Sequence, residues 1–283
     1  MQRRWSGGRY SPGGITVEYK GSQIDIVQYN EKYRAQLESF ELEERQLIYS
    51  SLPKEVLDEG LMDANRRPCI VLNKEGEVVG FFVLHQFYQH EGYDTPINAV
   101  YVRSLSINAK LQGSGYGTEI MMNIPTFVQT VFPDFENLYL VVDAENQAAW
   151  NLYERAGFLH LATNPEGPLG KERLYYLDLE GKYVSKLRLV QQGNVIILEK
   201  DGEATGHIKL EIEGKTAYIT AFETADAAVR ESALRQLATF VRKTAAEVEQ
   251  LVVRTDEPED YLNANFVHMD QQEPDVLTKL IRY

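Results

Sequence analysis

Three glycines occur within five positions, at Gly113, Gly115 and Gly117, between an apolar run and a helix-like segment. The apolar run covers residues 99–107, and the helical pattern begins near Thr118. Glycine allows positive φ and lets the backbone approach a ligand closely. Successive N–H groups at the start of a helix point at an anion, which the helix dipole also favours. The spacing therefore predicts a phosphate-binding turn and a phosphorylated cofactor.

Two common phosphate loops fit this turn less well. A P-loop requires the string G-x-x-x-x-G-K-S/T, which the sequence does not contain. A Rossmann dinucleotide loop requires G-x-G-x-x-G and an acidic residue at the end of the next strand. The spacing here is G-x-G-x-G, although Asp143 does follow the next apolar run. A dinucleotide-dependent enzyme therefore stays as a weaker alternative.

A second motif follows the glycine turn at a distance of about 30 residues. It consists of an apolar run over 138–142, Asn146 as a helix cap, and the string Leu-Tyr-x-x-x-Gly-Phe over 152–158. With the turn Gln112-Gly113-Ser114-Gly115-Tyr116-Gly117, this order resembles the GCN5-related N-acetyltransferase (GNAT) family, whose loop reads Q/R-x-x-G-x-G/A. The resemblance covers about residues 24–180. It implies a mixed α/β fold built around one sheet.

The resemblance also implies a donor and its contacts. The donor is acetyl-CoA or a related acyl-CoA, whose pantetheine arm runs along the strand before the turn. Backbone N–H groups of the turn hold the pyrophosphate, and the Gln112 side chain adds one donor. Asn146 contacts the pantetheine in the family, and it also suits a plain helix cap. The cofactor-binding residues implied are Leu105, Ser106, Ile107, Gln112, Gly113, Ser114, Gly115, Tyr116, Gly117, Thr118 and Asn146.

Tyr153 is the catalytic residue that the resemblance implies. When an amine attacks the thioester, CoA leaves as a thiolate, and a phenol beside the sulfur can protonate it. A tyrosine with its ordinary pKa of about 10 keeps its proton at pH 7. The alternative is that Tyr153 only packs against Phe158. Many relatives carry a glutamate base on the strand before the turn, but residues 101–106 contain no carboxylate, so the base stays unassigned. Water or one of Glu41, Glu43 and Glu44 are the alternatives.

An internal repeat predicts two copies of the scaffold. Residues 71–84 align with residues 197–210 at six of fourteen identical positions, and the order of later motifs is also repeated. We therefore expect an N-terminal arm (1–23), a GNAT-like domain (24–184) and a shorter, degenerate GNAT-like domain (185–283). In the second copy the stretch equivalent to the turn, residues 224–231, has no glycine. We predict that the second copy binds no cofactor.

Local signals predict several elements around the turn. Residues 24–27 alternate as a strand does, Pro53 begins a helix, and a Lys-Glu-Gly turn joins two strands ending near residue 87. Pro125 should kink or end the helix that follows the glycine turn. The last strand of the first copy covers residues 174–179.

The composition limits the function classes. The net charge of −13 disfavours a nucleic-acid partner and suits a cationic amine. The single cysteine, Cys69, excludes an internal disulfide, and the five histidines show no metal-ligand spacing. No signal peptide or membrane span is evident, so we expect a cytoplasmic monomer or homodimer without membrane or metal. The sequence thus predicts an N-acetyltransferase acting on a primary amine of a small molecule or peptide. A non-catalytic acyl-CoA-binding sensor or interaction module is the alternative.

Overall fold

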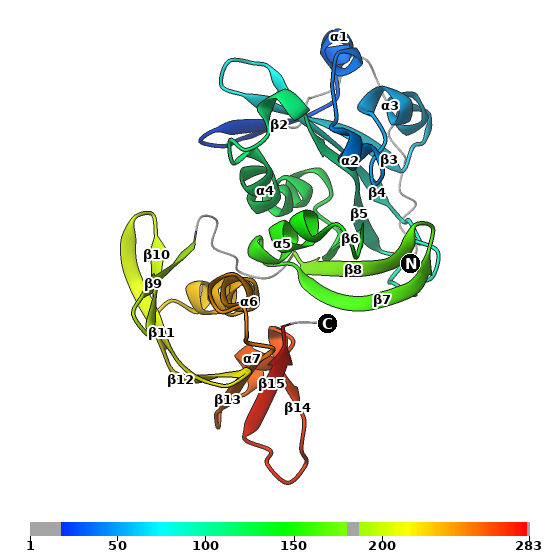
Figure 1. Cartoon of the computed structure of the whole chain (residues 1–283). Helices are drawn as coiled ribbons and strands as arrows, with labels where there is room; N and C mark the ends of the chain where they lie inside the picture. The colour runs from blue at the N-terminus through cyan, green and yellow to red at the C-terminus, as the bar shows by residue number, and fades with distance from the viewer. Residues whose placement is uncertain (1–17, 180–186, 282–283) are drawn as a thin grey trace. The chain divides into compact units, whose positions relative to one another are not determined.

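A computed structural model describes residues 18–179 and 187–281 of the 283-residue chain (Figure 1). Two compact units are present, and each is described by itself. The first holds the described residues up to Gln147 together with Leu161–Leu179. The second holds Ala148–His160 and the described residues from Leu187 onward. Residues 1–17 of the expected N-terminal arm lie outside the described residues, whereas Glu18–Lys20 form a strand.

The first sheet has eight strands in the order β1-β2-β3-β4-β5-β6-β8-β7. The β5–β6 pair is parallel, and the other pairs with a defined register are antiparallel. The strands are β1 (Glu18–Lys20), β2 (Ile24–Gln28), β3 (Arg66–Asn73), β4 (Val78–Gln86), β5 (Ala99–Ile107), β6 (Asn137–Asp143), β7 (Leu159–Gly167) and β8 (Gly170–Asp178).

Four short helices of the described chain precede β3, and a short helix followed by a long one connects β5 to β6. They are η1 (Glu31–Tyr33), α1 (Arg34–Glu38), α2 (Glu44–Leu47), α3 (Pro53–Met62), η2 (Ala109–Leu111) and α4 (Tyr116–Val131). The predicted strand from residue 24, the helix beginning at Pro53 and the β3–β4 hairpin are confirmed. Strand β7, which precedes β8, was not expected from the sequence.

The prediction that Pro125 would kink or end its helix early is wrong with respect to its end, since α4 continues to Val131. An internal proline removes one backbone hydrogen bond and costs about 3 kcal/mol. The buried face of α4 carries Ile120, Met121, Ile124, Phe127 and Val128, and two of these lie beyond the proline. Each such buried side chain contributes roughly 1.5–3 kcal/mol. Burial of Phe127 and Val128 therefore outweighs the local defect.

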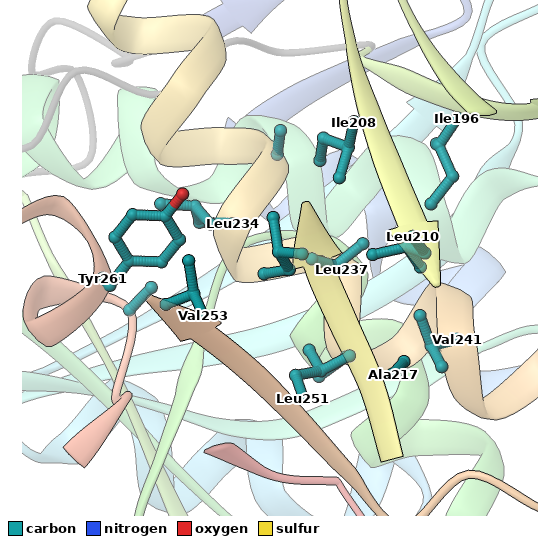
Figure 2. Packing of buried hydrophobic residues seen from close by; sticks show 14 of the residues in the cluster. Ile196, Ile208, Leu210, Ala217, Leu234, Leu237, Val241, Leu251, Val253 and Tyr261 are labelled. Atoms are coloured by element: carbon teal, nitrogen blue, oxygen red, sulfur yellow. The ribbon is translucent and has the colours of Figure 1, made fainter. Parts of the chain in front are cut away.

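The second unit contains a seven-stranded sheet in the order β14-β15-β13-β12-β11-β10-β9. Helix α6 packs on it, and Leu234, Leu237 and Val241 meet apolar residues of the strands (Figure 2). The elements are α5 (Gln147–Arg155, from Ala148 on), β9 (Arg188–Gln192), β10 (Val195–Lys200), β11 (Glu203–Glu213), β12 (Thr216–Thr224), α6 (Ala227–Thr244), β13 (Gln250–Arg254), α7 (Glu259–Asn263), β14 (Val267–His268) and β15 (Val276–Leu280).

The two sheets share one pattern of connections. In the first, β3, β4 and β5 form an antiparallel meander, α4 crosses over to the parallel strand β6, and β8 returns antiparallel. In the second, β10, β11 and β12 form the meander, α6 crosses over to β13, and β15 returns antiparallel. The repeated segments 71–84 and 197–210 fall on equivalent hairpins, β3–β4 and β10–β11.

Candidate active site

Strands β5 and β6 are paired only at their beginnings. Their register joins Ala99 to Asn137, Val100 to Leu138 and Tyr101 to Tyr139, and no later pair joins them in the described part of the sheet. Strand β5 nevertheless stays paired with β4 up to Ile107, and β6 stays paired with β8 up to Asp143. The two parallel strands therefore separate toward their C-terminal ends. The backbone of residues 105–107 lies on the edge of β5 that this separation leaves without a strand partner.

A bulge in β5 lies where the strands separate. Ser104 has a φ of 52°, which is unusual for a residue other than glycine. The β4–β5 register also shifts between Phe81 and Val83. Since a bulge bends the strand that contains it, Ser104 explains why β5 leaves β6 while keeping β4. The next residue but one, Ser106, has a buried hydroxyl oxygen with no hydrogen-bond partner among the described residues. Such an atom suits a polar group of a ligand.

The predicted glycine turn connects η2 to α4. Gly113 and Gly115 have φ values of 79° and 84°, which explains the need for glycine at both positions. Gly115 is the N-cap of α4, and no side chain caps the helix. The first N–H groups of α4 therefore have no side-chain cap among the described residues, which is the arrangement that a phosphate-binding turn requires.

The Gln112 side chain was expected to donate a hydrogen bond to the pyrophosphate, but it is bonded within the protein. Its Nε2 atom donates to the carbonyl of Ile107 at 3.0 Å and to Oε1 of Gln46 at 2.7 Å. A side-chain amide has two N–H donors, so both are used within the protein. In this structure the Gln112 side chain joins the end of β5 to α2 and supports the turn. Its backbone N–H donates to the carbonyl of Ala109 at 3.5 Å, so the donors left for a phosphate are those of the residues that follow Gln112.

The second sequence motif forms α5 and the residues beside it. Asn146 directly precedes the helix, and its N–H donates to the carbonyl of Asp143 at 3.0 Å. Tyr153 is half-buried, and burial raises the pKa of its phenol to about 12. Its ring centroid lies 6.4 Å from that of Phe158, so the packing alternative also holds. A phenol with this pKa keeps its proton at neutral pH, as a general acid must.

Comparisons with known proteins identify the family of this part of the chain. Residues 31–158 match the model of the acetyltransferase (GNAT) family. The chain is 34% identical over 154 residues to an uncharacterised N-acetyltransferase, YbbJ, of Bacillus subtilis (strain 168), covering 54% of this chain and 96% of that protein. The chain belongs to the GNAT family of acetyltransferases.

Solved acetyltransferase structures resemble a part of the chain. A spermidine N-acetyltransferase from Vibrio cholerae in complex with CoA and spermine is 17% identical, with 56% of this chain and 98% of that chain covered and a TM-score of 0.41. A GCN5-related N-acetyltransferase from Brucella melitensis is 14% identical, with 61% and 81% covered and a TM-score of 0.47. The family match ends at residue 158, so the degenerate second copy stays a prediction.

An N-acetyltransferase must remove a proton from its acceptor amine, and the structure presents a carboxylate that sequence reasoning missed. Glu172 stands opposite Asp143 in the β6–β8 pairing. One of its carboxylate oxygens is buried and has no hydrogen-bond partner within the described parts of the chain. Desolvation, and then the nearby Asp143, raise the pKa of Glu172, which His90 opposes. No sequence signal marks this residue, because only the strand register brings it to the end of β6.

The glutamates considered from sequence have other contacts in the acetyltransferase. Glu41 forms an ion pair with Lys110 at 2.7 Å, Glu43 takes part in a capping box at the start of α2, and Glu44 is an exposed residue of its first turn. These contacts are typical of surface and helix-end carboxylates.

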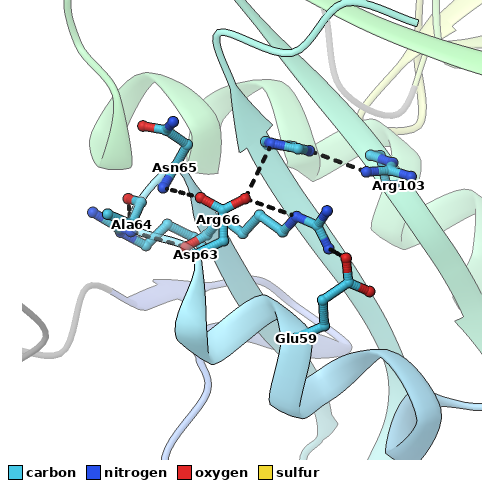
Figure 3. Close-up of polar contacts among 8 residues, drawn as sticks. Glu59, Asp63, Ala64, Asn65, Arg66 and Arg103 are labelled. Atoms are coloured by element: carbon cyan, nitrogen blue, oxygen red, sulfur yellow. Dashed lines mark hydrogen bonds and ion pairs between the residues drawn. The ribbon is translucent and has the colours of Figure 1, made fainter. Parts of the chain in front are cut away.

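Arg103 of β5 belongs to a polar network that the sequence did not suggest (Figure 3). Its Nη1 lies 3.1 Å from Nδ1 of His85, while Arg66 joins Asp63 at 3.2 Å and Glu59 at 2.8 Å. Burial and the Arg103 charge lower the pKa of His85 to about 4, so the ring is neutral. Arginine only donates, so Nδ1 accepts and the ring proton sits on Nε2. The acceptor nitrogen of His85 is thus occupied, which argues against His85 as the base.

The start of α6 contrasts with the start of α4. Asp226 caps α6, with Oδ1 accepting from the N–H groups of Ala228 and Val229 at 2.9 and 3.3 Å. Its other oxygen lies 3.0 Å from Nζ of Lys200. A carboxylate therefore occupies the donors that a phosphate uses at an uncapped helix.

Groups of metal ligands and membrane-spanning helices are both absent from the described residues. They contain no group of three or more histidine, cysteine, aspartate or glutamate side chains arranged to hold a metal ion. They also contain no helix that is long and apolar enough to cross a membrane.

Proposed function

We propose that this acetyltransferase moves an acetyl group from acetyl-CoA to a primary amine of a small molecule or a peptide. One observation carries the proposal: an uncapped glycine turn directly follows a strand that has separated from its parallel neighbour. The separated edge accepts an extended, amide-containing arm, and the turn accepts a pyrophosphate. The residues assigned to the donor are those at 105–107, 112–118 and Asn146.

Bound acetyl-CoA supplies the activated thioester, and the protein handles the protons. The amine nitrogen forms a bond to the thioester carbonyl carbon, the carbon–sulfur bond breaks, and the electron pair leaves with the sulfur. Tyr153 gives its proton to this sulfur, which matches its high pKa. The base takes the proton that the amine loses, so each turnover releases CoA as a thiol.

We assign the base to Glu172. Its raised pKa gives a carboxylate more affinity for the amine proton than an exposed glutamate has. Asp143 beside it adds a second negative charge at the end of β6, and the two carboxylates together attract a cationic amine. Glu172 would remove the amine proton either by direct contact with the amine or through one bridging water.

Titration calorimetry and a CoA-release assay test this function together. We expect one acetyl-CoA to bind per chain, because Asp226 caps the equivalent helix in the second unit, which we propose to be a degenerate GNAT-like domain. Release of CoA with at least one member of an amine panel supports the enzyme. Binding without release would favour a non-catalytic acyl-CoA sensor, which the absence of a carboxylate on residues 101–106 motivates. No binding at millimolar acetyl-CoA would exclude both.

The cellular setting is also a proposal. The one cysteine, Cys69, is buried and free, which suits a reducing compartment such as the cytoplasm. We propose a monomer or homodimer, which sedimentation at several protein concentrations would test.

A further inference from the structure

A cavity of about 210 Å3 lies within the second unit and takes no part in the function proposed above. It is lined by the end of α5 and the start of β7, by α6, by the loop before β14 and by β15. Its polar lining residues are Glu154, His160, Arg235, Asn265, Thr278 and Lys279.

Three cationic side chains are buried in this part of the unit, and carboxylates pair with two of them. Arg242 forms a buried ion pair with Glu154, and Arg235 lies 3.0 Å from Glu231. Lys279 is only 8% exposed, and no carboxylate of the described residues forms an ion pair with it. Among the described residues, this group of two carboxylates and three cations therefore contains one more positive charge than negative charge.

The Lys279 ammonium is also incompletely hydrogen-bonded. Its Nζ donates to the carbonyl of Ala264 at 2.8 Å, and the Phe266 ring centroid lies 5.9 Å away. An ammonium has three N–H donors, and burial of a charge without a counter-charge is unfavourable. Burial lowers the pKa of Lys279 to about 8; Glu154 raises it, whereas Arg242 and Arg235 lower it further. At neutral pH the side chain still carries its charge.

We infer that this cavity binds a small anion with a carboxylate or phosphate group, and that Lys279 is the counter-charge. Such a ligand supplies the missing negative charge and accepts the remaining N–H groups of Lys279. Arg235, which lines the same cavity, adds a second positive charge near the anion. Asn265, fixed by its donation to the carbonyl of His160 at 2.8 Å, forms part of the wall.

The experiment measures thermal unfolding and titration calorimetry of the full chain. The ligands are inorganic phosphate and, separately, sodium acetate, with sodium chloride at the same ionic strength as the control. We expect at least one of the two anions to raise Tm and bind with saturation. Lys279→Met should weaken this binding at least roughly tenfold, because a hydrogen bond to a charged group contributes that much. Lys209→Met, at a half-buried lysine of β11 that lies outside the cavity, should leave this binding unchanged.

Each outcome decides the proposal. A response to phosphate alone identifies a phosphoryl ligand, and a response to acetate alone identifies a carboxylate. The proposal is overturned when neither anion exceeds chloride, or when Lys279→Met responds as the parent does, which would place the anion elsewhere, for example at the glycine turn. Lys279→Gln is the second variant for the same comparison if the methionine variant does not fold.

Discussion

Asp143 and Glu172 are paired across β6 and β8, at the end of β6 from which β5 has separated. Two carboxylates placed opposite each other on neighbouring strands repel. Desolvation by burial is the main cause of the raised pKa of Glu172, and the charge of Asp143 adds to it. A purely structural role does not require two adjacent carboxylates. For the proposed reaction, the negative charge of the pair would attract a cationic amine, and the raised pKa of Glu172 would help it to remove the amine proton.

Replacing Glu172 tests the assignment of the base. Glu172→Gln should lower kcat/KM by about 10²–10⁴ and leave acetyl-CoA affinity nearly unchanged. In the parent enzyme kcat/KM should rise with pH as Glu172 loses its proton, at a pH above the ordinary glutamate value of 4.5. The Glu172→Gln variant should not show this rise of kcat/KM with pH. The matched control is Glu166→Gln, an exposed glutamate of β7.

A second substitution displaces Glu172 without removing it. A Cβ at Gly167 would lie 2.3 Å from Cγ of Glu172, so Gly167→Ala should push the carboxylate away from its place. We expect the same loss of kcat/KM as in Glu172→Gln, although smaller. Full activity in both variants would remove Glu172 from the mechanism.

Tyr153→Phe separates acid catalysis from packing. The ring is kept, so the contact with Phe158 and the fold should remain, while kcat falls by about 10²–10⁴. Acetyl-CoA affinity, followed by calorimetry, should stay within a few-fold. The control is Tyr218→Phe on β12. If kcat were unchanged in the Tyr153 variant, Tyr153 would have only its packing role against Phe158.

Two glycines with the same backbone conformation allow a matched test of the turn. Gly115 (φ 84°) caps α4, and Gly76 (φ 82°) lies in the β3–β4 turn; neither has a heavy atom near an added Cβ. Alanine at either position should therefore cost about 1–2 kcal/mol of unfolding free energy through φ alone. Only Gly115→Ala should weaken acetyl-CoA binding. Equal affinities in the two variants, measured by calorimetry, would argue against the turn as the pyrophosphate site.

Lys279 predicts a specific dependence of stability on pH. Its pKa is about 8 in the folded chain, against 10.5 for an ordinary lysine. Between these values the unfolded chain binds more protons, so the unfolding free energy should rise with pH across this window. This difference in the pKa of Lys279 corresponds to a rise of about 3 kcal/mol in the unfolding free energy across the window. Lys279→Met should lack the rise and be more stable than the parent below pH 8, as urea unfolding at several pH values would show.

The features that the sequence predicted depend on local chemistry. Glycines at positive φ, the Asn30 cap of η1 and Pro53 at the start of α3 act within a few residues, so their spacing is readable. Gly157, with a φ of 96°, ends the Tyr153 motif for the same reason. These signals identified the turn and the motif that define the family.

The features that the sequence missed depend on distant partners. The pKa of Glu172 is raised by burial in the folded sheet and then by Asp143, which the register of β6 and β8 places opposite it. Lys279 is unusual because the other buried cations of its unit have carboxylate partners. Strand β7 contains Pro165 and is largely exposed, so it lacks the apolar alternation that marks a strand. Helix α4 continues past Pro125 because burial of Phe127 and Val128 stabilises its last turns. A rule that considers only the proline and its neighbours in sequence does not include this tertiary packing.

Asp226 has a consequence for how the two units respond to cofactor. Helix α6 carries its own anion, so the second unit needs no ligand to complete that helix end. Helix α4 has no side-chain cap, so an anion bound there would supply hydrogen-bond acceptors for its first turn. A ligand at 100 times its Kd stabilises the state that binds it by about 2.7 kcal/mol. Acetyl-CoA should therefore raise the unfolding temperature of the first unit and leave that of the second unit nearly unchanged. The unfolding temperature of the first unit would then report the concentration of acetyl-CoA in solution.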